Sequence, residues 1–248
     1  MNEESLEGGR GQDAPPIKIG DTVRRNASKR SAYVHDVLEF LESADYAWSP
    51  KFLGVDEQGR EILEYIDGYV PHGQDVPNET WSLETMEETF KKIREFHDIT
   101  AGTALAESKE CVVHGDLGYY NTVYENGRGI KFIDWDFARP GKRISDVAFA
   151  LNQYLSIGEY EGDGGPKERA ALARKLVDAY GLSAEQRMVL TQQMLNEFIG
   201  AINNQVAEAR KGKLSAIKLV EAGVPERLKN RHDWLERNRA IFDDAFFA

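Results

Sequence analysis

Hydrophobic and polar positions alternate in strand fashion in two stretches of the first 68 residues. The segment IKIGDTVRR alternates on both sides of Gly20-Asp21, a dipeptide that favours a hairpin turn. A second strand–turn–strand pattern occupies residues 50–68, with its turn at Gln58-Gly59. Between them, Val34, Val37, Leu38 and Leu41 have the spacing of one helix face. The pattern therefore predicts a small β-rich lobe with one helix over residues 17–66.

In the remainder of the chain, strand-like alternation is less frequent, and hydrophobic residues recur at helical spacing over long stretches. Helical spacing begins near Leu83 and continues to His97, and it returns from Ile144 nearly to the end. Two short strand patterns lie between these stretches, in ECVVHGD and in TVYENGRGIKFIDWD, the second with an Asn126-Gly127 turn. Pro166 after two glycines and a Ser183 capping box each predict the start of a helix.

These elements predict an α+β fold with two lobes. Residues 1–68 form a small antiparallel β-rich N-terminal lobe with one helix, and residues 69–248 form a larger, mostly helical lobe. The first sixteen residues are polar and rich in Gly, Glu and Pro, so we expect a mobile tail or a loosely held loop without regular structure there. The segment of residues 67–82 contains two prolines and two glycines and is typical of a connector.

Composition and charge narrow the class of protein. The 248 residues include 31 basic and 42 acidic side chains, a formal net charge of −11 that disfavours nucleic acid and anionic membranes as partners and favours a cationic ligand. The single cysteine, Cys111, excludes an internal disulfide and suits a reducing compartment. There is no apolar run of about 20 residues and no secretory pattern at the start, so we expect a cytoplasmic location and no membrane partner.

The candidate chemistry lies in residues 112–141. Asp116 and Asn121 share one loop, and Asp134 ends the hairpin that follows, so the three side chains can converge because a hairpin returns the chain to its start. Phosphoryl transfer needs such a set, in which one carboxylate orients a hydroxyl and accepts its proton while an Asn and an Asp hold Mg²⁺ on the nucleotide phosphates. The gap between Asp116 and Asn121 equals that of the protein-kinase catalytic loop. Asp136 is expected to be a turn or capping residue close to Asp134.

Three segments of the chain carry a family resemblance: HGDLGYYN, FIDWDFARPG and ISDVAFAL. With them the chain resembles the aminoglycoside phosphotransferase family, whose members are relatives of the choline kinases. The resemblance implies a protein kinase-like two-lobed fold. It makes Asp116 the catalytic base and Asn121 and Asp134 the metal ligands. It also implies that His114 braces the loop and that Asp146 anchors it from the next helix.

The N-terminal part of the resemblance concerns the nucleotide. LEYIDG resembles the interlobe hinge, which implies that the backbones of Glu64 and Ile66 bind the adenine. The usual lysine of the third strand is absent, and Arg25 is expected to take its role because it shares a strand face with Val23. Little sequence precedes this strand, which leaves little room for the usual first strand and phosphate-covering loop.

The sequence thus predicts a small-molecule kinase that uses ATP or GTP with Mg²⁺. The acceptor is a hydroxyl-bearing small molecule such as an aminoglycoside, choline or another amino alcohol. A polycationic acceptor would need several acidic contacts, and the candidates for these are Glu159, Glu161, Asp163, Asp243 and Asp244. Two alternatives stay open. One is a catalytically weak kinase-fold module that only binds nucleotide, and the other is a protein kinase, which the short segment between Asp134 and Asp146 disfavours.

Overall fold

The computed structural model describes residues 3–6, 15–71, 81–125, 128–158 and 164–247. The chain divides into two compact units, of which unit 1 comprises Met1–Thr85 and Lys92–Arg143 and unit 2 comprises Met86–Lys91 and Ile144–Ala248. This division groups the candidate catalytic loop with the N-terminal sheet. The boundary at residue 68 between a nucleotide-binding and a catalytic lobe stays a prediction.

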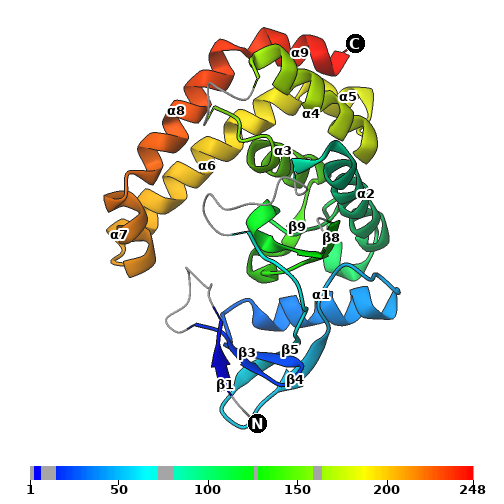
Figure 1. Ribbon diagram of the computed structural model, residues 1–248, viewed down its shortest axis with the longest axis vertical. Coiled ribbons are helices and arrows are strands. Elements are labelled where there is room, and N and C mark those ends of the chain that lie inside the picture. Colours follow the sequence, from blue (N-terminus) through cyan, green and yellow to red (C-terminus); the bar gives the residue numbers. More distant parts are fainter. Residues whose placement is uncertain (1–2, 7–14, 72–80, 126–127, 159–163, 248) are drawn as a thin grey trace. The chain divides into compact units, whose positions relative to one another are not determined.

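Unit 1 contains a five-stranded antiparallel sheet with the strand order β1-β2-β3-β5-β4 (Figure 1). The strands are β1 (Glu3–Ser5), β2 (Ile17–Ile19), β3 (Thr22–Asn26), β4 (Phe52–Val55) and β5 (Arg60–Glu64). Both predicted hairpins are confirmed, because β2 pairs with β3 and β4 with β5. Their turns include Gly20 at φ 59° and Gly59 at φ 76°, left-handed angles that glycine adopts without steric cost.

Strand β1 overturns the expectation that the first sixteen residues have no structure. Glu3 lies opposite Ile19 in the antiparallel pair with β2, and the Leu6 N–H donates to the Pro16 carbonyl at 2.9 Å. Strand pairing uses backbone groups, so the polar and exposed side chains of β1 do not prevent it. The chain therefore does have a first strand, and the Gly-rich stretch at residues 7–11 lies outside the described residues.

Helix α1 (Ser31–Ser43) confirms the predicted amphipathic segment. Its four periodic side chains, Val34, Val37, Leu38 and Leu41, are all buried. Burial of an aliphatic side chain of this size contributes roughly 1.5–3 kcal/mol. The polar face of the helix carries His35, which takes part in the site described below.

Two small antiparallel sheets in unit 1 carry the candidate catalytic residues. One pairs β6 (Cys111–Val113) with β9 (Arg139–Gly141), and the other pairs β7 (Thr122–Glu125) with β8 (Arg128–Phe132). Strands β6, β7 and β8 were predicted, whereas β9 was not. The expected Asn126-Gly127 turn lies outside the described residues.

The predicted connector is tied to the catalytic hairpin at its first residues. Tyr69 and Tyr124 exchange two backbone hydrogen bonds of 2.8 and 2.7 Å. Gly68, at φ 148°, permits this approach, since a Cβ there would lie 2.6 Å from Cγ1 of Val123. The part of the connector at residues 72–80 lies outside the described residues.

Unit 2 is helical. Helix α2 (Leu83–Thr100) contributes residues to both units, and the later helices are α3 (Arg143–Tyr154), α4 (Pro166–Tyr180), α5 (Ala184–Met188), α6 (Leu190–Arg210), α7 (Leu214–Glu221), α8 (Val224–Arg237) and α9 (Arg239–Phe247). The predicted helix starts at Pro166 and at the Ser183 capping box are both confirmed. Helices α6 and α8 lie side by side, and α9 packs on α4 (Figure 1).

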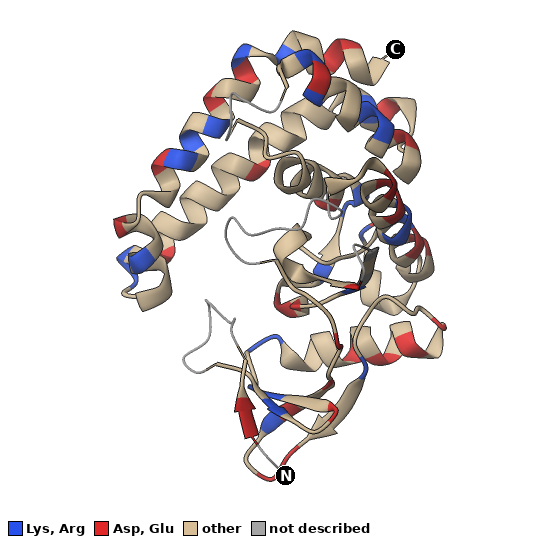
Figure 2. Ribbon diagram, viewed as in Figure 1, with Lys and Arg blue, Asp and Glu red and all other residues tan. Residues whose placement is uncertain are grey.

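Charge is distributed unevenly over unit 2. Acidic and basic residues are interspersed along α8, whereas most of α6 carries neither (Figure 2). Within the part of the chain that the structure describes, there is no helix with the length and hydrophobicity needed to cross a membrane. Three of the acidic residues considered for acceptor binding, Glu159, Glu161 and Asp163, lie outside the described residues.

Candidate active site

The loop after β6 brings Asp116 and Asn121 into direct contact. The amide nitrogen of Asn121 donates to the backbone carbonyl and to Oδ2 of Asp116, both at 2.9 Å. The Tyr120 hydroxyl donates to the other carboxylate oxygen, Oδ1, at 3.1 Å. Three hydrogen bonds therefore fix the orientation of Asp116 with respect to the loop.

His114 joins this loop to the end of β8. Its Nδ1 accepts from the Asp116 N–H at 3.3 Å, and its Nε2 lies 3.1 Å from the Ile133 carbonyl. Accepting at Nδ1 and donating at Nε2 requires the neutral ring with its proton on Nε2. The ring is fully buried and packs 4.6 Å from the Trp135 ring, centroid to centroid. The contacts match the bracing role expected for this histidine.

Asp134 lies two residues after the end of β8, and the residue before it is tied to Asn121 through the backbone. The Ile133 N–H donates to the Asn121 carbonyl at 2.9 Å. Asp134 itself has left-handed backbone angles, φ 64° and ψ 57°, which are uncommon outside glycine. Burial and then the neighbouring Asp136 raise the pKa of Asp134, and Arg25 opposes them.

Arg25, on β3, reaches the acids of this hairpin. Its Nη2 lies 2.6 Å from Asp136 and its Nη1 lies 3.6 Å from Asp134. Burial lowers the pKa of Arg25, but Asp136, Glu61 and Asp134 outweigh it, so the pKa stays above the ordinary value. Arg24 points elsewhere, donating to Thr22 and lying 3.8 Å from Asp56. Of the two arginines, Arg25 is thus the one beside the candidate metal ligand.

Two acids of this arrangement were not identified from the sequence as site residues. Glu61 on β5 binds Nε of Arg25 at 2.6 Å, and Asp136, expected to be a turn residue, binds the same guanidinium. The burial of β5 alternates, so that Glu61 shares the buried side of the strand with Leu63. A charged residue on the apolar face of an alternating strand is the signal that could have identified Glu61.

Glu64 and Ile66, expected to bind adenine, lie at and just after the end of β5. The Glu64 N–H donates to the Lys51 carbonyl at 2.9 Å, and its carboxylate pairs with Lys131 at 2.8 Å. The next residue, Tyr65, donates its N–H to the Asp21 carbonyl at 3.0 Å. These bonds fix the start of the hinge segment, and adenine binding by the two backbones stays a prediction.

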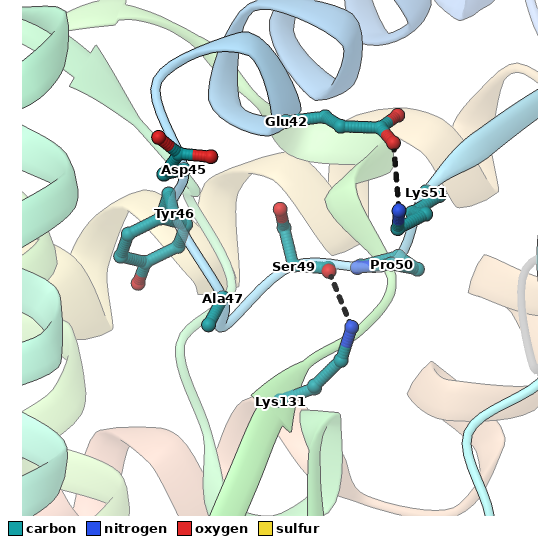
Figure 3. A pocket seen from close by; sticks show the side chains of 8 residues that line it. All are labelled: Glu42, Asp45, Tyr46, Ala47, Ser49, Pro50, Lys51 and Lys131. Carbon is teal, nitrogen blue, oxygen red and sulfur yellow. Dashed lines mark hydrogen bonds and ion pairs between the residues drawn. The ribbon is translucent and has the colours of Figure 1, made fainter.

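A surface cavity of about 200 Å³ lies beside this segment (Figure 3). Its lining consists of Glu42, Asp45, Tyr46, Ala47, Ser49, Pro50, Lys51 and Lys131. Lys51 pairs with Glu42 at 2.8 Å, and Lys131 donates to the Ser49 carbonyl at 3.2 Å. Both ammonium groups therefore already have partners, and none of the candidate catalytic residues lines this cavity.

The donor atoms fit a magnesium ion held mainly by a nucleotide. Asn121 uses its amide nitrogen on Asp116, which leaves the carbonyl oxygen as its ligating atom, and Asp134 adds a partly exposed carboxylate. Mg²⁺ prefers such oxygens and is commonly bound through one or two protein ligands plus substrate phosphates. Among the described residues there is no group of three or more His, Cys, Asp or Glu side chains suited to a metal ion.

Comparison with known proteins then decides the family. Residues 18–189 match the phosphotransferase enzyme family, called APH. The chain belongs to this family. The resemblance on which the sequence analysis relied is thereby confirmed, and the APH match includes Arg25, Asp116, Asn121 and Asp134.

Similar proteins add detail to the APH assignment. The chain is 31% identical over 230 residues to the trifolitoxin immunity protein of Rhizobium leguminosarum bv. trifolii, covering 84% of this chain and 86% of that protein. A choline/ethanolamine kinase family protein from Mesorhizobium loti has a similar structure, with a TM-score of 0.62 at 14% identity, covering 100% of this chain and 92% of the other.

An ADP-bound aminoglycoside phosphotransferase has a TM-score of 0.53 at 14% identity, covering 95% of this chain and 94% of the other. Identities this low establish the fold and nothing finer. The predicted α+β, kinase-like two-lobed fold is therefore confirmed, and membership of the APH family supports a phosphotransferase that acts on a small molecule.

Proposed function

We propose that this protein is a Mg²⁺-dependent phosphotransferase that moves the terminal phosphoryl group of ATP or GTP to a hydroxyl group of a small molecule. The observation that carries the proposal is the hydrogen-bonded link from Asp116 through Asn121 to the residue before Asp134. This link places a candidate base and two candidate metal ligands on one connected framework. His114 strengthens it by joining the same loop and strand.

Asp116 orients the acceptor hydroxyl and accepts its proton as the oxygen attacks the terminal phosphorus. A new bond forms between that oxygen and phosphorus while the bond to the bridging oxygen breaks, and the nucleoside diphosphate leaves with the electron pair. Asn121 and Tyr120 hold both carboxylate oxygens of Asp116, which limits its rotation during this step. Positioning of this kind supplies much of the rate enhancement in phosphoryl transfer.

Asn121 and Asp134 would hold Mg²⁺, which when bound neutralises charge on the nucleotide phosphates. Arg25 lies beside Asp134 and contributes a permanent positive charge to the same place. An arginine can bind two phosphate oxygens at once, so it can replace the usual lysine although its geometry differs. The backbones of Glu64 and Ile66 would bind the base.

The acceptor is a hydroxyl-bearing compound, and a cationic one such as an aminoglycoside or amino alcohol suits the net charge of −11. The similarity to an immunity protein favours a second, narrower candidate: protection of a cell through phosphorylation of a toxic compound. The two candidates share one chemistry and differ in the identity of the acceptor.

The rival function is a module that binds nucleotide without transferring phosphate. Purified protein would be incubated with ATP or GTP, Mg²⁺ and a panel of aminoglycosides, amino alcohols and other antibacterial compounds, with phosphorylated products identified by mass spectrometry. Product from the wild type, and none from Asp116→Asn at equal nucleotide affinity, supports the transferase. Magnesium-dependent nucleotide binding without product, and without a difference between the two proteins in nucleotide hydrolysis, supports the binding module.

A further inference from the structure

Glu61 is a buried acid in the centre of the N-terminal sheet. Its side chain is 1% exposed, and it lies directly opposite Arg25 in the antiparallel pairing of β3 with β5. Residues directly opposite each other in such a pair project to the same face of the sheet. Moving a carboxylate out of water is costly unless hydrogen bonds and opposite charges offset the loss. The position of Glu61 therefore requires a set of dedicated partners.

The structure shows these partners. One carboxylate oxygen binds Nε of Arg25 at 2.6 Å, and the other lies 2.8 Å from Nε2 of His35 on α1. The Ser31 hydroxyl also donates to the carboxylate. Burial raises the pKa of Glu61, but Arg25, Ser31 and His35 more than offset this effect and hold the pKa below its ordinary value. Glu61 is therefore ionised at neutral pH.

The contacts of Arg25 are divided by atom. Nε faces Glu61, while Nη2 and Nη1 face Asp136 and Asp134. A guanidinium is planar and rigid, so a partner that fixes Nε also fixes the directions of the two terminal nitrogens. Glu61 thus holds one edge of the group on the sheet and leaves the other edge directed toward the candidate metal ligand.

This arrangement differs from that of protein kinases. There, a lysine on the third strand pairs with a glutamate on the following helix. Here the acid is on β5, and the helix contributes His35 to its second oxygen. A lysine at position 25 has three N–H donors on a single nitrogen, so pairing with Glu61 would draw all of them to one point, and no second nitrogen would extend toward Asp134.

We propose that Glu61 is a positioning residue, one that fixes Arg25 through Nε so that Nη1 faces the nucleotide phosphates beside Asp134 while Nη2 pairs with Asp136. The inference rests on the proposed phosphotransferase function and adds a residue to its nucleotide site. It explains why an arginine occupies this position in the chain. On this proposal, a positive charge at residue 25 binds the nucleotide phosphates well only when its side chain is also held in the right orientation.

A double-mutant cycle tests the proposal. Glu61→Met removes the acceptor at similar volume, Arg25→Gln removes the positive charge, and the double variant combines them, with affinity for Mg²⁺–ADP and the KM for Mg²⁺–ATP measured for each. If Glu61 acts through Arg25, Glu61→Met weakens nucleotide binding by about tenfold in the wild type and by less than about twofold in the Arg25→Gln background. Equal losses in both backgrounds would overturn the proposal.

Two further variants give independent readouts. Glu61→Gln keeps an oxygen acceptor for Nε and is expected to restore most of the affinity lost in Glu61→Met. Arg25→Lys keeps the charge yet is expected to lose about as much affinity as Glu61→Met. An Arg25→Lys variant with wild-type affinity would overturn the proposal without requiring that any Glu61 variant fold.

Controls separate positioning from folding and from the proposed function itself. Arg24 on β3 forms a neighbouring ion pair with Asp56, which lies in the turn between β4 and β5. The variants Arg24→Lys and Asp56→Asn alter this pair and should leave nucleotide affinity unchanged. Thermal unfolding reports whether each variant folds. If the wild type shows no Mg²⁺-dependent nucleotide binding, the proposed function fails and this inference fails with it, whereas wild-type binding with additive losses in the cycle overturns the inference alone.

Discussion

Asn121 donates from its amide nitrogen to both the backbone carbonyl and the carboxylate of Asp116. The side chain thereby stiffens the loop that carries the candidate base, and its own carbonyl oxygen is not used in these two bonds. One residue thus connects the candidate base to the proposed metal site. The consequence is that the two functions cannot be separated completely by mutation at position 121.

Replacement of Asn121 by Asp is expected to affect both functions. A carboxylate there can still bind Mg²⁺, but it cannot donate to Asp116, and the two negative charges repel each other. We expect kcat to fall by at least about tenfold, with a changed requirement for Mg²⁺, because general-base catalysis contributes about 10²–10⁴-fold and depends on geometry. Steady-state kinetics over a range of Mg²⁺ concentrations measures this.

The matched variant for that experiment is Asp134→Asn. It weakens the second proposed metal ligand and leaves the hydrogen bond from Asn121 to Asp116 intact. It should raise the Mg²⁺ concentration needed for half-maximal rate. Wild-type Mg²⁺ dependence in both variants would contradict the assignment of these residues as ligands.

Gly115 is expected to tolerate no side chain. Its φ is 82°, and a Cβ would lie 2.2 Å from Nη1 of Arg139 and 2.7 Å from the Phe137 carbonyl oxygen. Gly115→Ala should destabilise the protein by about 1–3 kcal/mol, through backbone strain together with steric overlap, and should displace the loop. Urea unfolding measures the change in stability.

Gly102→Ala is the control for backbone strain alone, because Gly102 has a similar φ of 73° and a Cβ there meets nothing within 4 Å. Gly115→Ala should lower the free energy of unfolding by more than Gly102→Ala does. Equal losses would show that the loop can move to relieve the overlap.

The sequence defines the catalytic loop better than it defines the surroundings of Arg25. Asp116 and Asn121 are five positions apart, so their contact depends on one loop and follows from the motif. Arg25 and Glu61 are separated by 36 positions. Their contact depends on the register of β3 against β5, which hydrophobic alternation restricts to one face but does not fix.

Two strands were missed for related reasons. Strand β1 is short and its side chains are polar and exposed, so it has no hydrophobic alternation to detect. Strand β9 contains Pro140 and Gly141, residues that are depleted in strands, and it pairs with β6 only because the loop returns there. Tertiary context formed both strands against their local propensities.

Acid should destabilise the wild type partly through Glu61. The pKa of Glu61 in the folded protein is lower than its ordinary value of 4.5, so its ionised form stabilises the fold above that value. This contribution is lost as the pH falls from 4.5 through the lower folded-state pKa. Glu61→Gln removes the titrating group and should therefore show a flatter decline of unfolding free energy over this range.

Urea unfolding at several pH values between neutral and acidic conditions measures both curves. Asp56→Asn is a useful comparison, because the pKa of Asp56 is also lowered. Burial opposes this shift, but hydrogen bonds from Arg60 and Gln58 in the turn outweigh it. A wild-type and a Glu61→Gln curve with the same slope below pH 4.5 would show that folding does not lower the pKa of Glu61.

The central claim is that Asp116 acts as the base on a framework shared with the metal ligands. The most direct measurement is the rate of phosphoryl transfer by Asp116→Asn under single-turnover conditions, together with its affinity for Mg²⁺–nucleotide. We predict a rate lower by about 10²–10⁴-fold with affinity within a few-fold of the wild type. A transfer rate equal to that of the wild type would contradict the account.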